Sequence, residues 1–203
     1  LKHLRKFVVV TAFYELTQIL INNGDILLVK HFFEAHEAGL YSSLALIGRA
    51  VYFVAWMFVM LLLPEVVKRE KEGLDTSRLF FKYLGMITFL AIAIVVVNAM
   101  FPALIINILF GEAYVEVASL LWKYALASSL FAIANVFVYY FLSLDKYLPV
   151  LLSGIFGLLQ LTVIFFQHES LEMVVEAQIF VMTLLLIVQG IYFLYHMKRS
   201  IRR

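Results

Sequence analysis

The sequence contains no cysteine, and this absence excludes disulfide bonds and thiolate metal sites. Charge is scarce as well: 15% of the 203 residues are charged, whereas soluble domains have about a quarter. The chain also lacks a glycine-rich phosphate-binding loop, an HExxH motif and a GxSxG motif. We therefore expect no metal ion and no other cofactor.

Hydrophobic residues dominate the chain. They make up 64% of it, with 19 Phe and 11 Tyr, and the mean hydropathy is +0.96. This composition predicts an integral membrane protein. The sequence begins at Leu1 rather than at Met, so we expect a fragment or a processed product. The apolar run after Lys6 lacks a small-residue cleavage site and is long enough to span a membrane, so we do not interpret it as a signal peptide.

Long apolar runs define the expected fold, because a membrane helix needs roughly 20 mostly apolar residues. We predict an all-α integral membrane protein, a single six-helix lobe over residues 1–203, with spans at about 7–30, 40–66, 79–104, 117–143, 148–167 and 173–196. The third apolar run continues to Phe110, which is too long for one span. We expect Pro102 to break it and to leave residues 103–110 as a short piece at the outer face.

The basic residues are distributed unevenly between the two sides of this topology. Of the 16 Lys and Arg, 13 fall at the N-terminus, in the second and fourth connections with their flanks, or in the C-terminal tail. They are Lys2, Arg5, Lys6, Lys68, Arg69, Lys71, Arg78, Lys82, Lys146, Lys198, Arg199, Arg202 and Arg203. The positive-inside rule then places both termini in the cytoplasm, in agreement with an even number of spans.

A polar stripe crosses the first span. Thr11, Glu15, Gln18, Asn22 and Asp25 fall on one face of a helix with 3.6 residues per turn. A charge at the bilayer centre costs about 2.5–3.5 kcal/mol on insertion scales, so this stripe should not face lipid. It forms either a hydrogen-bonding seam between helices or the lining of an aqueous cavity. We favour the cavity, because two carboxylates on one stripe exceed what a packing seam needs.

Other spans supply polar partners for the stripe. Ser42, Arg49, Tyr52 and Trp56 share a face of the second span. Arg49 and Asp25 lie at similar depths below the outer ends of their helices, close enough for the two side chains to meet. Arg49 is then either a counter-ion for Asp25 or a binding group for an anionic substrate.

The fourth span carries a milder polar face, formed by Tyr124, Ser128, Asn135 and Tyr139. Lys123 lies on a different face, near the outer boundary, where its side chain either snorkels to the surface or contributes to the pathway. On the fifth span, Ser153 and Gly157 form a pair of small residues that is more typical of close helix packing than of a binding site.

Three stretches resemble the second half of the polysaccharide flippases, in the multidrug/oligosaccharidyl-lipid/polysaccharide exporter superfamily. They are NNGDILLVKHFFEAHEAGLYSSLALIGRAVYF at residues 22–53, LLLPEVVKREKEG at residues 61–73 and ILFGEAYVEVASLLWKYAL at residues 108–126. The shared pattern consists of Asn23 and Asp25, the Gly39–Leu40–Tyr41 run, Pro64 at the end of the second helix, and the run from Phe110 to Tyr114. Members of that family have about twice as many spans, in two lobes, so this chain is similar to the C-terminal lobe alone.

The resemblance implies a transporter that moves an undecaprenyl-pyrophosphate-linked glycan across the bacterial or archaeal plasma membrane by alternating access. Its partners would be membrane lipid, this glycolipid, an N-terminal lobe, and a coupling proton or sodium ion, with no nucleic acid. Amides, hydroxyls and aromatic faces suit a sugar head group, and an Arg suits a pyrophosphate. The candidate substrate and ion pathway consists of Glu15, Gln18, Asn22, Asn23, Asp25, Arg49, Tyr52, Lys123, Tyr124 and Asn135.

Three alternatives remain open. An ion-coupled multidrug antiporter of the same superfamily would also use an intramembrane carboxylate, although Arg49 disfavours cationic drugs. A membrane-embedded glycan polymerase or ligase usually needs a sizeable extracytoplasmic loop, and the outer loops predicted here are short, so we expect no enzyme. A lobe that acts only as a scaffold is the third alternative.

Overall fold

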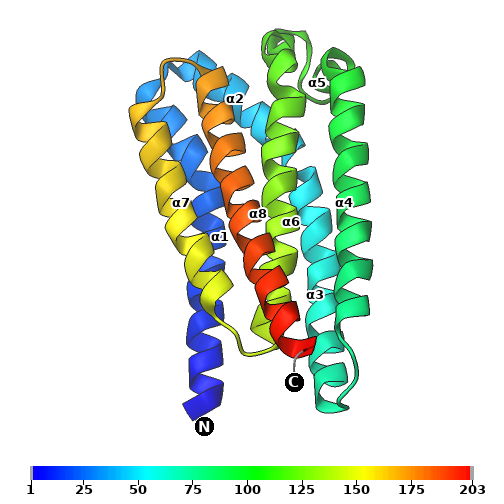
Figure 1. The fold of residues 1–203 in the computed structure, drawn as a ribbon. Helices are drawn as coiled ribbons and strands as arrows, with labels where there is room; N and C mark the ends of the chain where they lie inside the picture. The colour runs from blue at the N-terminus through cyan, green and yellow to red at the C-terminus, as the bar shows by residue number, and fades with distance from the viewer. Residues whose placement is uncertain (1, 202–203) are drawn as a thin grey trace.

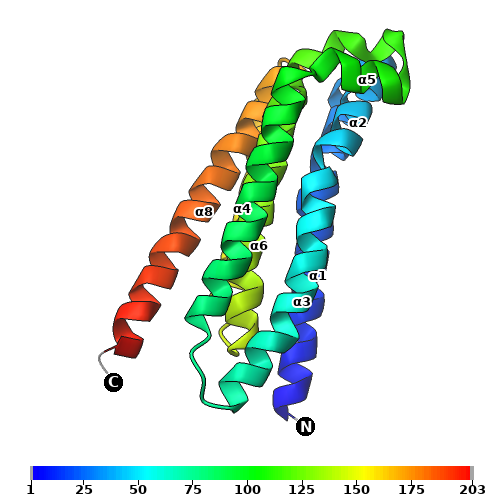
Figure 2. The ribbon, with the colours of Figure 1, turned by 90° about the vertical axis from the view of Figure 1, so that its right-hand side faces the viewer.

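The computed structural model describes residues 2–201, and every element within these residues is helical, which confirms the expected all-α class (Figure 1). The elements are α1 (Lys2–Phe32), α2 (Ala35–Gly48), α3 (Ala50–Lys71), α4 (Ser77–Met100), α5 (Pro102–Phe110), the 3-10 helix η1 (Glu112–Leu120), α6 (Leu121–Ser143), α7 (Leu148–Phe166) and α8 (Leu171–Ile201). Figures 1 and 2 show the long helices side by side in one bundle. The start of α1, the α3–α4 turn and the end of α8 lie at one end, and α2 and α5 lie at the other.

The described residues contain five helices that are long and apolar enough to cross a membrane. They are Ala35–Lys71, Ser77–Met100, Glu112–Ser143, Leu148–Phe166 and Leu171–Lys198. The chain is therefore a multi-pass membrane protein. Helix α1 lies alongside the others but is not one of the five, because the polar residues of its stripe reduce its hydropathy. The sixth span stays a prediction.

Helix α6 forms the centre of the bundle. In the segment Glu112–Ser143, 78% of the most apolar window is buried, against 22% in α4 and 39% in α8. Helices α3, α4 and α8 pack around α6, and α1 packs on α7. An apolar cluster around Phe80, Phe137, Phe141 and Phe193 fills the space between α4, α6 and α8.

The predicted effects of the two prolines on the helices agree with the structure only in part. Pro102 does separate α4 from α5, as expected, because a proline cannot continue the preceding helix. Pro64, expected to end the second helix, lies inside α3, which continues to Lys71. The predicted span 40–66 is instead divided at Arg49, whose φ of −79° and ψ of −6° separate α2 from α3. The backbone remains hydrogen-bonded across this junction, from Arg49 N to Ala45 O at 3.1 Å.

Close packing of α1 on α7 depends on small residues of α7. A Cβ added to Gly157 would lie 2.8 Å from Cγ1 of Ile21, so only glycine allows this approach. Gln160 donates from Nε2 to the Ile21 carbonyl at 3.2 Å. Gly157 therefore belongs to a packing contact, as its spacing from Ser153 predicted. Ser153 itself accepts a hydrogen bond from Nε2 of Gln189 in α8 at 3.0 Å.

Candidate functional site

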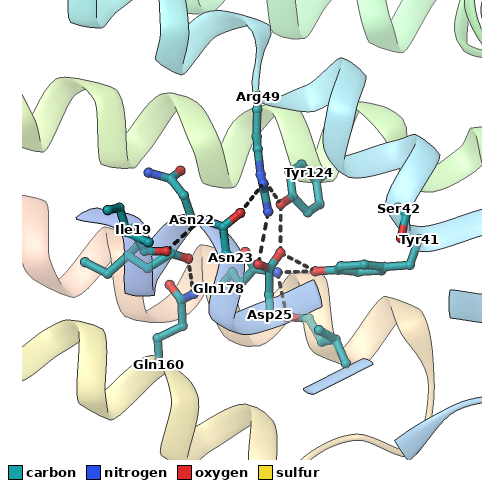
Figure 3. Close-up of polar contacts among 12 residues, drawn as sticks. Ile19, Asn22, Asn23, Asp25, Tyr41, Ser42, Arg49, Tyr124, Gln160 and Gln178 are labelled. Carbon is teal, nitrogen blue, oxygen red and sulfur yellow. Dashed lines mark hydrogen bonds and ion pairs between the residues drawn. The ribbon is translucent and has the colours of Figure 1, made fainter. Parts of the chain in front are cut away.

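A buried ion pair joins α1 to the α2–α3 junction. Asp25 is fully buried, and its Oδ1 lies 3.2 Å from Nη2 of Arg49 (Figure 3). Its other oxygen accepts hydrogen bonds from the hydroxyls of Tyr124, at 2.7 Å, and Tyr41, at 2.9 Å. Gln178 of α8 donates to the Tyr41 hydroxyl at 2.6 Å. The carboxylate is thus compensated by one cation and two hydroxyls, as a buried charge requires.

The guanidinium of Arg49 makes two further contacts. Its Nε donates to the Tyr124 hydroxyl at 3.1 Å, and its Nη1 donates to Oδ1 of Asn23 at 3.3 Å. A guanidinium has five N–H donors, and the contacts to Asn23, Asp25 and Tyr124 use three of them. Arg49 therefore keeps donors for an additional anion.

A chain of hydrogen bonds runs from the interior of the bundle to Glu15. Tyr14 donates to Oδ1 of Asn135, and Asn135 donates from Nδ2 to Oε1 of Gln18 at 2.8 Å. Gln18 donates from Nε2 to the Tyr139 hydroxyl at 2.7 Å, and Tyr139 donates to Oε1 of Glu15 at 2.5 Å. All the hydrogen bonds in this chain have the same donor-to-acceptor direction. The last one is accepted by the half-buried carboxylate of Glu15.

A pocket of about 290 Å³ opens between α1 and α3 beside these two networks. Its lining residues are Glu15, Gln18, Ile19, Asn22, Asn23, Arg49, Tyr52, Phe53 and Trp56. The wall from α1 carries a carboxylate and three amides, and the wall from α3 carries three aromatic rings. Arg49 lies between the two walls, at the helix junction. The pocket therefore combines one cation, one carboxylate, hydrogen-bonding amides and aromatic faces.

The structure divides the predicted site residues into three groups. Glu15, Gln18, Asn22, Asn23, Arg49 and Tyr52 line the pocket. Asp25, Tyr124 and Asn135 lie behind it as buried partners. Lys123 is elsewhere: its Nζ lies 2.6 Å from Glu172 and 2.7 Å from Glu176, in a partly exposed cluster between α6 and α8.

The polar stripe of α1 both forms hydrogen bonds to other helices and lines the pocket. Gln18 and Asp25 are buried among helices, whereas Glu15 and Asn22 are partly exposed at the pocket. Thr11 lies outside the pocket, and its buried Oγ1 has no hydrogen-bond partner in the described part of the chain. Ser42 also lies outside it, and its hydroxyl donates to the Ala38 carbonyl one turn earlier in α2 at 2.7 Å.

Four residues of these networks were not predicted as site residues. Tyr139 was predicted only as part of the milder polar face of the fourth span. Tyr14 is one turn before Gln18 on α1, and this spacing was a usable signal. Tyr41 stood in the Gly-Leu-Tyr run, but nothing in the sequence directed its hydroxyl to Asp25. Gln178 gave no signal, because one amide on an apolar helix does not specify its partner.

In the part of the chain that the structure describes, no three His, Asp or Glu side chains gather closely enough to hold a metal ion.

Residues 1–119 match the sequence model of a family described as polysaccharide biosynthesis protein. The match spans α1 through nearly all of η1, which is more than half of the chain, and it includes every residue that lines the pocket. No curated protein and no solved structure matches the chain.

Proposed function

Because this chain belongs to the polysaccharide biosynthesis protein family, we propose that it is a flippase lobe for a lipid-linked oligosaccharide or polysaccharide precursor. The cargo is an undecaprenyl-pyrophosphate-linked glycan, and the membrane is a bacterial or archaeal plasma membrane. The protein acts as a transporter rather than an enzyme. Its partners are membrane lipid and an N-terminal lobe, either in the same full-length chain or in a separate one.

The pocket between α1 and α3 is the observation that carries this proposal. A glycolipid head group offers an anionic diphosphate, many hydroxyls and the apolar faces of its sugar rings. Arg49 has guanidinium donors left for the diphosphate, since Asn23, Asp25 and Tyr124 use only three of the five. Asn22 and Asn23 supply amides, and Trp56 supplies an aromatic face.

The surface around the pocket supports a covering lobe. Ile19 and Phe53 line the pocket, and Leu16 and Met57 are next to lining residues on α1 and α3. All four side chains are more than half exposed. In the complete transporter, a second lobe covers this face and closes the cavity, and the lipid tail leaves between the lobes. The two lobes alternate access by moving against each other.

Glu15 is the candidate for ion coupling. Among the described residues that line the pocket, it is the only carboxylate, and the hydrogen-bond chain through Gln18 and Tyr139 ends on it. Intramembrane carboxylates often bind the coupling proton or sodium ion of a transporter. A multidrug antiporter is the second candidate, because Glu15 would also attract a cationic drug. Arg49 in the same pocket opposes that cargo.

The proposal is tested with variants of two residues that line the pocket, Asn22→Ala and Trp56→Ala. In the complete transporter, each should reduce glycan export at least several-fold at unchanged membrane levels, and the lipid-linked precursor should accumulate. Mass spectrometry of extracted lipids measures that accumulation. Thr162→Ala, at an exposed position on α7, is the matched control. Normal glycan export by both pocket variants would contradict the proposal.

A further inference from the structure

A second cavity, of about 610 Å³, lies at the opposite end of the bundle from α2 and α5. The α3–α4 turn, the α6–α7 turn and the last turns of α8 come together there (Figures 1 and 2). None of its lining residues belongs to the pocket between α1 and α3. Its volume falls within the range of small-ligand sites, about 300–1,000 Å³.

The lining of this cavity carries charges of both signs. Glu70 and Asp75 come from the end of α3 and the turn after it, and Lys146 comes from the α6–α7 turn. The backbone N–H of Ser77 donates to Oδ1 of Asp75 at 2.9 Å and holds the pKa of that carboxyl below its usual range. Asp75 is therefore an anion at neutral pH. Lys146 lies against His196 of α8, within hydrogen-bonding distance of its ring nitrogens.

Hydroxyl groups complete the lining. Thr76 and Tyr140 share a hydrogen bond of 2.9 Å, and the side chain of Ser77 lies beside them. A purely anionic ligand would meet two carboxylates here, and a purely cationic one would meet Lys146. A ligand that carries both an ammonium and a phosphate satisfies both groups of charges.

The surroundings of the cavity favour a lipid over a soluble ligand. Tyr192 and Tyr195 of α8 line it at the end of a membrane-spanning helix, a position typical of interfacial aromatic residues. Large apolar side chains are exposed on the adjacent turns: Phe81 of α4 at 50%, and Ile191 and Leu194 of α8 at 62% and 61%. Phe81 contacts Phe193, so α4 and α8 meet next to the cavity.

We propose that this cavity binds the head group of a zwitterionic phospholipid with a primary ammonium, of the phosphatidylethanolamine type. The ammonium donates to Glu70 and Asp75, and the phosphate accepts from Lys146 and the neighbouring hydroxyls. The acyl chains lie along the exposed apolar side chains of α4 and α8. A primary ammonium fits better than a quaternary one, because carboxylates need N–H donors. This site depends on membrane insertion alone, not on the identity of the cargo.

The experiment is a lipid titration of the full purified chain, read by native mass spectrometry. The lipids are phosphatidylethanolamine, its N,N-dimethyl derivative, phosphatidylcholine and phosphatidylglycerol, all with the same acyl chains. Phosphatidylethanolamine should bind about tenfold more tightly than phosphatidylcholine or phosphatidylglycerol, the equivalent of about 1.4 kcal/mol. Soluble phosphoethanolamine should not compete at similar concentrations, because it lacks the apolar chains.

Variants locate the site. Lys146→Gln, and the double change Glu70→Gln with Asp75→Asn, should each remove the selectivity. Lys71→Gln and Glu72→Gln, exposed neighbours in the same turn and outside the cavity, should keep it. Equal binding of the four lipids by the unmodified chain would overturn the proposal whether or not any variant folds. Unchanged selectivity in the cavity variants would also overturn it, and efficient competition by soluble phosphoethanolamine would overturn the assignment to a lipid.

Discussion

Arg49 has two roles at one position: it separates α2 from α3, and it neutralises the fully buried Asp25. Removing one member of a buried ion pair leaves an uncompensated charge, which typically costs 3–5 kcal/mol. The tyrosine hydroxyls on Asp25 reduce that cost but do not neutralise the carboxylate. The pair is therefore the most sensitive point of the site to substitution.

Asp25→Ala and Arg49→Ala should each abolish glycan export by the complete transporter and lower its membrane level. The double variant separates the two roles of Arg49. If Arg49 also binds the substrate anion, the double variant should recover its membrane level and remain inactive. Immunoblotting of membranes gives the level, and export of labelled glycan gives the activity.

Arg49→Lys is the conservative control for this prediction. It should insert normally but export poorly, because an ammonium lacks the planar donor fork. Full export by Arg49→Ala at normal membrane levels would show that the anion binds elsewhere in the transporter.

The individual contacts could be predicted only in part. Counting residues along two helices placed Arg49 and Asp25 at similar depths, and the structure joins them at 3.2 Å. Helical spacing likewise gathered Glu15, Gln18 and Asn22 on one face. The same reasoning could not find Tyr41 or Gln178, since their contacts depend on how α2 and α8 rotate about their axes.

At the scale of elements, the junction between α2 and α3 depends on Gly48. A Cβ at this position would lie 2.4 Å from Cδ1 of Tyr124 and 3.2 Å from the backbone nitrogen of Ala125. The Tyr124 ring cannot move aside without losing its bonds to Asp25 and Arg49. Glycine thus allows α2 to approach α6 closely enough for the site to form.

Gly48→Ala should destabilise the protein by about 1–3 kcal/mol, the usual cost of overpacking. It should also weaken export, because Tyr124 moves away from the ion pair. Gly85→Ala on α4 is the matched control: nothing lies within 4 Å of its added Cβ, and alanine favours a helix. Thermal unfolding of the two purified variants gives the comparison, and equal unfolding temperatures would contradict this account of Gly48.

Helix boundaries were predictable where the local chemistry was decisive. Pro102 follows directly on the last turn of α4, and the chain breaks there. Pro64 shows the limit of the rule, because α3 continues beyond it to Lys71 with Val66 fully buried. The break at Arg49 was not predicted, although Gly48 directly before it is a poor helix former. The Arg49 side chain bonds to Asp25, Asn23 and Tyr124 at this junction.

At the scale of the whole molecule, the turns alternate between two ends. The α3–α4 and α6–α7 turns lie at the end that also holds the start of α1 and the end of α8. Most of the basic residues between α1 and α8 lie in or next to these two turns. The positive-inside rule therefore predicts that this end faces the cytoplasm.

Single cysteines test this orientation on a background without native cysteine. Glu37→Cys, in α2, should react with an impermeant thiol reagent added outside intact cells. Glu72→Cys, in the α3–α4 turn, should react only after the cells are opened. Both positions are exposed, so access to the reagent depends on the membrane alone. Labelling of both from the same side would refute the six-span topology.

The polar stripe of α1 also constrains how the protein is made. Tyr52, Tyr124, Asn135 and Tyr139 satisfy that stripe, and all of them are synthesised after α1. A helix that carries Glu15 and Asp25 gains little by leaving the translocation channel for lipid alone. We therefore expect helix α1 to remain in or beside the channel until α6 emerges from the ribosome. These helices would then enter the membrane together. Helix α1, the first of them to be synthesised, would be among the last to reach its final position.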